Sequence, residues 1–121
     1  MNSYLLVALG GAIGAVGRFA LGQAFAGRWP GWPWGTLTVN VAGGFAMGLL
    51  AAWLLRGGSE DARLLLGVGV LGGFTTFSAF SLEMFAMIER GALGAALGYA
   101  LLSVAGALAA LALGHALVKA I

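Results

Sequence analysis

Residues Gly67 to Glu83 read GVGVLGGFTTFSAFSLE and bring together hydroxyl groups, aromatic rings and a carboxylate. The hydroxyls of Thr76 and Ser78 can donate hydrogen bonds to an anion. Phe77 and Phe80 are three residues apart and would be neighbours on a helix, and the edge of an aromatic ring carries partial positive charge. These residues could hold a small anion weakly, or they could be packed core, which is the commoner use of phenylalanine.

Three polar residues elsewhere stand in otherwise apolar sequence: Asn40, Tyr99 and Ser103. The Asn40 amide offers two N–H donors and one acceptor oxygen. It could form a hydrogen bond between helices or donate to a ligand, since polar groups within apolar helices serve both purposes. Tyr99 and Ser103 lie one helical turn apart, so their hydroxyls could line a track or bond to the neighbouring backbone.

Two charged residues also interrupt apolar sequence, Arg18 and Glu83. Arg18 lies four residues after Gly14 and four before Gly22, on a face of small residues that can approach a neighbouring helix. Its guanidinium must meet carbonyl groups, water or an acid there. We interpret Arg18 as a structural anchor in preference to a substrate ligand, and the role of Glu83 is open.

The composition indicates the medium that surrounds these residues. The chain has 121 residues, of which 61% are hydrophobic and 8% are charged, whereas a soluble domain carries about 25% charged residues. Each of four apolar stretches is long enough for a helix to cross a bilayer, which takes about 20 residues; they are residues 4–26, 34–55, 64–88 and 92–118. We predict an all-α membrane protein with a single four-helix transmembrane domain, residues 1–121.

The third stretch contains a poor sequence for continuing a helix, the pair Gly72–Gly73 followed by the pair Thr75–Thr76. We predict that this span is broken near mid-membrane, starting at Gly72. A break frees carbonyl groups that suit a small cation and N–H groups that suit an anion. Thr76 or Ser78 could cap the second half.

Positive charges barely distinguish the two sides of the membrane. With four spans, the termini and the middle connection share one side. The charges counted are Arg56, Arg63 and Lys119 on that side, and Arg28 and Arg90 on the other. The orientation of a membrane protein follows the difference in Lys and Arg between the two sides. Because that difference is only one charge here, we hypothesise that two copies assemble antiparallel.

Several function classes are excluded by what the sequence lacks. Without cysteine, thiolate catalysis, disulfides and zinc–thiolate sites are ruled out. The chain has no basic run, which excludes nucleic acid as a partner. The spacing of Gly67, Gly69 and Gly72 matches a dinucleotide-binding turn, but that turn requires a βαβ unit, and here it is flanked by apolar spans. We predict neither enzyme activity nor nucleotide binding.

Three runs, GGAIGAVGR, GTLTVNVAGGFAMG and GGFTTFSAFSLE, follow one another in the first three stretches. With these runs and its length, the whole chain resembles bacterial fluoride channels of the Fluc family, also called CrcB. The resemblance implies a fluoride-selective channel in the bacterial inner membrane that passively exports fluoride and so reduces its toxicity. It also implies a dual-topology, antiparallel homodimer with two fluoride pathways lined by both subunits.

The resemblance assigns roles to individual residues by motif. Backbone carbonyls of Gly72 and Thr75 from each subunit would hold a central structural sodium ion. The Asn40 amide and the ring edges of Phe77 and Phe80 would face fluoride. The remaining matched residues are Ser78, Tyr99 and Ser103 on the anion pathway, Arg18 of the first span, and Glu83, whose role stays open.

The chain departs from the family pattern at two positions. The run that commonly reads FSTFS has Ala79 in place of threonine, and Ala107 stands where a second hydroxyl would follow Ser103. The resemblance therefore implies a shorter hydroxyl track here, which leaves open the donors that contact fluoride.

Two other functions are compatible with parts of the sequence. A small dual-topology, proton-coupled multidrug exporter has four spans and a similar length, but it would use a carboxylate deep in the first span, where this chain has Arg18. A small structural or assembly factor would need only packing, which accounts poorly for Asn40 and the predicted break.

Overall fold

The computed structural model describes residues 2–27 and 32–121, and the regular structure in these residues is all helical. The elements are α1 (Ser3–Phe25), α2 (Trp34–Leu54), α3 (Glu60–Ala62), η1 (Arg63–Leu71), α4 (Gly72–Phe74), α5 (Ser78–Glu89) and α6 (Leu93–Ala120). Four helical stretches are long and apolar enough to cross a membrane: Ser3–Phe25, Trp34–Leu54, Glu60–Glu89 and Leu93–Ala120. The prediction of an all-α chain with four potential membrane spans is confirmed.

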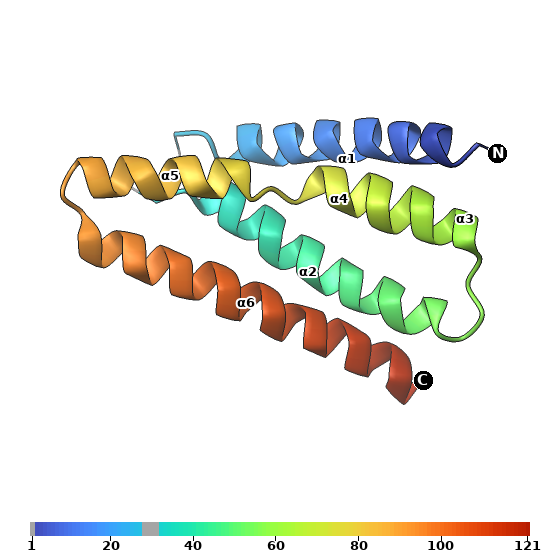
Figure 1. Ribbon diagram of the computed structural model, residues 1–121. Coiled ribbons are helices and arrows are strands. Elements are labelled where there is room, and N and C mark those ends of the chain that lie inside the picture. The colour runs from blue at the N-terminus through green and yellow to red at the C-terminus, as the bar shows by residue number, and fades with distance from the viewer. Residues whose placement is uncertain (1, 28–31) are drawn as a thin grey trace.

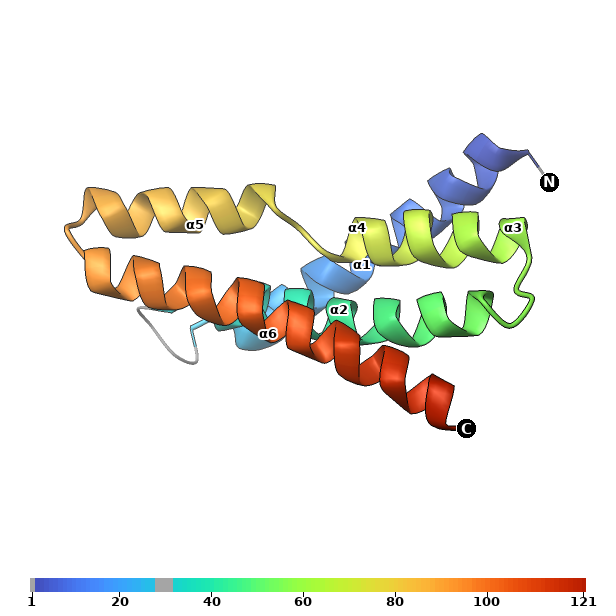
Figure 2. The ribbon, with the colours of Figure 1, turned by 60° about the horizontal axis from the view of Figure 1, so that its bottom comes forward.

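The helices pack mainly as two pairs, α1 against η1 and α4, and α2 against α6. Figures 1 and 2 show α5 continuing beyond α4 toward the far end of the bundle, where it turns into α6. The N- and C-terminal ends of the described chain lie at the opposite end of the bundle, the end where α3 is found (Figure 1). The polar residues of the second, third and last spans are therefore brought together along one side of α2.

Glycines allow the first of these pairs to pack backbone against backbone. A Cβ atom on Gly14 would overlap the carbonyl oxygen of Val70 and lie 2.8 Å from the backbone nitrogen of Phe74. On the facing helix, a Cβ on Gly69 would lie 2.8 Å from the Cα of Gly10. Such close approach is how membrane helices gain dispersion energy where water supplies no driving force.

The pair α2 and α6 uses the same device. A Cβ on Gly44 would lie 2.7 Å from the carbonyl oxygen of Ala107, and one on Gly48 would overlap the carbonyl oxygen of Leu111. Gly44 and Gly48 are one turn apart, so α2 presents a flat strip to α6. This close packing fixes the height of Asn40, one turn before Gly44, relative to Ser103 on α6.

Three residues between α4 and α5, Thr75 to Phe77, belong to no helix. Gly72 is helical, with φ −63° and ψ −39°, so the prediction that irregular backbone begins at Gly72 is wrong. The first extended residue is Thr75, with φ −81° and ψ 156°. The helix ends there because the next N–H, that of Thr76, donates to the Asn40 side chain and not to the preceding turn.

The sequence between α1 and α2 contains Trp29 and Trp32, and α2 begins with Trp34; three tryptophans so close in sequence are typical of an interfacial aromatic belt. Trp32 and Trp34 stack with ring centroids 5.7 Å apart. Trp29, and with it Arg28 of the charge tally, lies outside the described residues.

Candidate functional site

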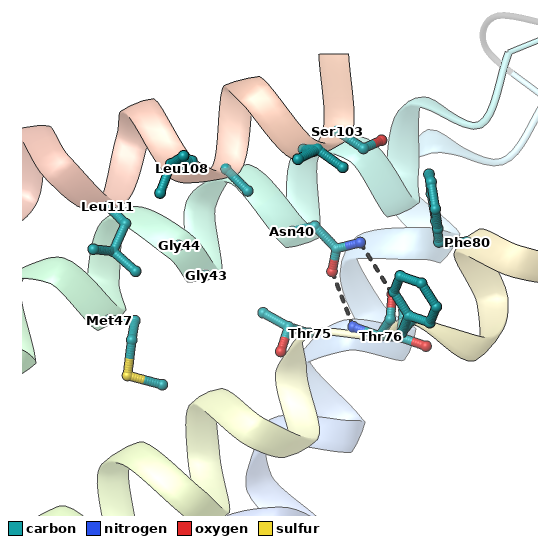
Figure 3. A pocket seen from close by; sticks show the side chains of 13 residues that line it. Asn40, Gly43, Gly44, Met47, Thr75, Thr76, Phe80, Ser103, Leu108 and Leu111 are labelled. Carbon is teal, nitrogen blue, oxygen red and sulfur yellow. Dashed lines mark hydrogen bonds between the residues drawn. The ribbon is translucent and has the colours of Figure 1, made fainter. Parts of the chain in front are cut away.

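The Asn40 side chain of α2 is joined to the backbone of Thr76 by two reciprocal hydrogen bonds. Asn40 Nδ2 donates to the Thr76 carbonyl at 3.0 Å, and the Thr76 N–H donates to Asn40 Oδ1 at 2.9 Å (Figure 3). The interhelical hydrogen bond that the sequence allowed is thus present. Since an amide nitrogen carries two hydrogens, the second N–H of Asn40 is not used by this pair.

The backbone carbonyl groups of Leu71, Gly72 and Thr75 lie around α4. They differ in whether they already accept a hydrogen bond. The Leu71 carbonyl accepts from both the backbone nitrogen and the hydroxyl of Thr75, at 3.0 and 2.9 Å. Among residues 2–27 and 32–121, no donor bonds to the carbonyl of Gly72 or to that of Thr75. These two oxygens therefore keep their lone pairs for another partner.

Arg18 reaches from α1 to the same helix end. Its Nε donates to the Gly73 carbonyl at 3.3 Å, and the side chain is half-buried. A cation is favourable at a helix C-terminus, where the unsatisfied carbonyls carry partial negative charge. From the sequence, we expected the Arg18 guanidinium to meet carbonyl groups, water or an acid, and its partner here is a carbonyl group. Arg18 also lines a cavity of about 180 Å³, together with Gln23, Thr36 and Thr76.

Glu83 of α5 is the centre of a second polar group. Its Oε1 accepts a hydrogen bond from the Tyr99 hydroxyl and its Oε2 accepts one from the Thr36 hydroxyl, each at 3.0 Å. A carboxylate inside the membrane is costly unless it is paired, and these neutral donors from α6 and α2 supply that pairing. Sequence reasoning missed Thr36, although it lies one turn before Asn40 on the same helix face.

Three aromatic rings follow one another beside these polar groups. The Phe77 and Phe80 centroids are 5.5 Å apart, and those of Phe80 and Tyr99 are 5.1 Å apart. Phe77 precedes α5, so the helix spacing that suggested the pair does not apply, yet the rings are adjacent. Phe77 is 76% exposed, whereas Phe80 is 9% exposed and Tyr99 is fully buried. Most of the Phe77 ring surface is therefore left uncovered by residues 2–27 and 32–121.

An open groove of about 480 Å³ runs between α2, α6 and the segment from Thr75 to Phe80. Asn40, Ser103 and Phe80 lie toward one end, and Met47, Leu108 and Leu111 toward the other (Figure 3). The Ser103 hydroxyl is buried, and within the described part of the chain it has no hydrogen-bond partner.

The predicted site residues do not all meet in this groove. Those that line it are Asn40, Thr75, Phe77, Phe80 and Ser103. Tyr99 lies behind Phe80, against Glu83. Ser78 is exposed, with its hydroxyl 3.3 Å from that of Thr76. The N-cap residue of α5 is Phe77, and the Thr76 hydroxyl before it accepts from the Ala79 N–H at 3.2 Å.

Chemically, the groove offers hydrogen-bond donors and aromatic rings, and no Lys, Arg or His is among the residues that line it. In the described ranges, no group of three or more His, Cys, Asp or Glu side chains could hold a metal ion. The backbone carbonyls of Gly72 and Thr75 are uncharged oxygens that could hold a cation. The arrangement suits reversible binding of a small anion.

Comparison with known proteins identifies relatives along nearly the whole chain. Residues 5–115 match the family described as "CrcB-like protein, Camphor Resistance (CrcB)". A protein of Caulobacter vibrioides (strain NA1000 / CB15N) is 57% identical over 115 residues, covering 92% of this chain and 91% of the relative. One of Phenylobacterium zucineum (strain HLK1) is 58% identical over 123 residues, covering 98% and 97%. One of Chelativorans sp. (strain BNC1) is 56% identical over 125 residues, covering 100% and 99%.

Each of these three relatives is named "Fluoride-specific ion channel FluC". A family of ion channels is not one of enzymes, so the prediction that the chain is not an enzyme is confirmed. The resemblance inferred from the three glycine- and threonine-rich runs is confirmed as well, and the chain belongs to the CrcB-like family.

Proposed function

We propose that this protein is a fluoride channel of the bacterial inner membrane that lets fluoride leave the cell passively and so reduces its toxicity. The observation that carries the proposal is membership of a family whose relatives are named fluoride-specific channels. The groove supports it, because its donors are neutral and its lining includes no fixed charge.

Neutral donors suit conduction of a small, tightly hydrated anion. A channel must replace the hydration shell well enough to admit the ion and weakly enough to release it. The unused Asn40 N–H, the unpartnered Ser103 hydroxyl and the edge of Phe80 offer such moderate contacts. A negative-inside potential then favours export of an anion by about 2.3 kcal/mol per 100 mV.

Two copies are proposed to assemble antiparallel, so that the partner covers the groove and the exposed ring of Phe77. In this proposed assembly the third span is a broken helix. The elements α3, η1 and α4 come before the break, and α5 comes after it. The nearly even charge tally allows insertion in both orientations. A C-terminal tag accessible from only one side of the membrane in every copy would contradict dual topology.

A structural sodium ion is proposed at the centre of this dimer. The residues present fit such an ion, because the unpaired carbonyls of Gly72 and Thr75 are the uncharged oxygen ligands that hard cations prefer. Two oxygens from one chain leave the coordination incomplete, and a second copy would double them. A bound ion would neutralise carbonyl dipoles that otherwise stay unsatisfied at membrane depth.

Replacing sodium by potassium in all solutions is expected to lower the thermal midpoint of the purified dimer by about 5 °C or more, because ligand binding stabilises the folded state. Melting would be followed at constant ionic strength and chloride concentration. Return of sodium should restore the original midpoint. The same midpoint in both salts would remove the sodium ion from the proposal.

The function itself is tested with liposomes loaded with a fluoride salt. Purified protein and a potassium ionophore are added, and external fluoride and chloride are followed with electrodes. Fast fluoride efflux with little chloride efflux supports a fluoride channel. Fluoride efflux no faster than from protein-free liposomes would refute the proposed function.

Phe80→Ile is expected to slow fluoride efflux by about fivefold in this assay, since it replaces a ring edge worth about 1 kcal/mol with an aliphatic chain of similar bulk. The dimer should elute from a sizing column as before, because Phe80 packs within one chain against Tyr99. Wild-type efflux by this variant would show that the ring edge does not contact the ion.

A further inference from the structure

Trp32 is held at the start of α2 by a proline turn. Pro33 has φ −83° and ψ 65°, and the Trp34 N–H donates to the Trp32 carbonyl at 2.9 Å. These values define an inverse γ-turn, and the ring of Pro33 restricts φ to the region that the turn needs. The backbone at Trp32 therefore has a defined position relative to α2.

The indole ring of Trp32 packs on the Tyr99 side of the bundle. The two rings meet edge to face, with centroids 6.0 Å apart and planes at 80°. Trp32 also packs against the buried cluster formed by Phe80, Met87, Ala96 and Tyr99. Gly98, next to Tyr99 on α6, faces the same ring, since a Cβ there would be in ordinary contact with the indole at 3.6 Å.

Trp32 thereby completes a continuous series of ring contacts from the groove to the end of the bundle. Phe77 contacts Phe80, Phe80 contacts Tyr99, and Tyr99 contacts Trp32. The hydroxyl of Tyr99 is also the donor to Glu83. Trp32 therefore covers Tyr99, the residue that links the ring of Phe80 to the Glu83 carboxylate.

We propose that Trp32 is a positioning residue that sets the preference of the channel for fluoride over chloride. It keeps the Tyr99 ring in place and water away from the hydrogen bond between Tyr99 and Glu83. A hydrogen bond in a dry surrounding is stronger than one exposed to water, so the Tyr99 hydroxyl keeps a fixed direction. This inference rests on the proposed function.

The experiment compares fluoride and chloride efflux from liposomes for wild type, Trp32→Ala, Trp32→Leu and Trp32→Phe. Trp32→Ala and Trp32→Leu remove the ring, and each should lower the fluoride-to-chloride ratio by about fivefold or more, the factor that one net hydrogen bond supplies. Trp32→Phe keeps a ring and should stay within about twofold of wild type. If Trp32→Ala does not fold, Trp32→Leu, which retains apolar bulk, carries the test.

Trp34→Ala is the matched control, because Trp34 is the first residue of α2, two residues after Trp32, and its ring stacks on that of Trp32. It should leave the ratio unchanged within about twofold, since the contact to Tyr99 is made by Trp32. An unchanged ratio in Trp32→Leu, or an equal loss in Trp34→Ala, would overturn the inference. Failure of the proposed function is a different result: the wild type itself would then show no fluoride efflux.

Discussion

Asn40→Asp is expected to reduce fluoride efflux by about a hundredfold, since an ionised side chain at membrane depth costs about 2.5–3.5 kcal/mol. The aspartate lacks the Nδ2 donor, so the Thr76 carbonyl loses its partner and faces a second oxygen. The carboxylate also lies on the wall of the groove, where it repels an approaching anion. The lost hydrogen bond and the repulsion of the anion therefore both reduce fluoride efflux. Liposome efflux measures the change.

Asn40→Ser separates the two causes. Serine is neutral and keeps a hydroxyl donor, but it is too short to form both bonds to Thr76. Its efflux should fall between that of wild type and Asn40→Asp, at about a thirtieth of wild type, if both hydrogen bonds are lost and each costs about 1 kcal/mol. Wild-type flux in Asn40→Asp would mean that neither the reciprocal pair nor the groove serves conduction.

Gly14→Val is expected to lower the yield of folded protein several-fold. The added Cβ overlaps the Val70 carbonyl oxygen and lies 2.8 Å from the Phe74 nitrogen. Both atoms belong to backbone, so relief requires separation of α1 from η1 and α4. Overpacking of this kind costs about 1–3 kcal/mol or more, out of a typical stability of about 5–15 kcal/mol. The yield of monodisperse protein after detergent extraction measures the effect.

Gly22→Val is the control on the same helix. Nothing lies within 4 Å of a Cβ built at Gly22, so the same helix propensity cost applies without the overlap. Its yield should remain close to that of wild type. Equal yields of folded protein from the two variants would show that α1 and η1 tolerate a wider separation than the close contact implies.

The sequence was sufficient to predict the helical architecture and several of the polar residues that contact one another in the structure. Hydropathy and length identify the spans, and the isolation of Asn40 in an apolar stretch singles it out. The position of the helix end was not predictable from propensity, because Gly72 and Gly73 are helical and the end is set by Asn40, which comes from another helix. A tertiary hydrogen bond thus overrode the local signal.

The pairing of Glu83 was equally beyond local reasoning. Its two donors, Thr36 and Tyr99, are 47 and 16 residues away along the chain. Helix periodicity places each on a face, but the faces meet only because glycines bring α2 and α6 into backbone contact. The π-helical turns of η1 were also not foreseen, and they change which residues after Arg63 face α1.

The location of both termini at one end of the bundle has a consequence for how such a dimer could be encoded (Figure 1). If two copies are inverted relative to one another, the last residue of the first copy and the first residue of the second lie on opposite sides of the membrane. A short soluble linker cannot join them. A single gene that contained both copies would need an additional crossing segment between them, whereas two separate chains need none.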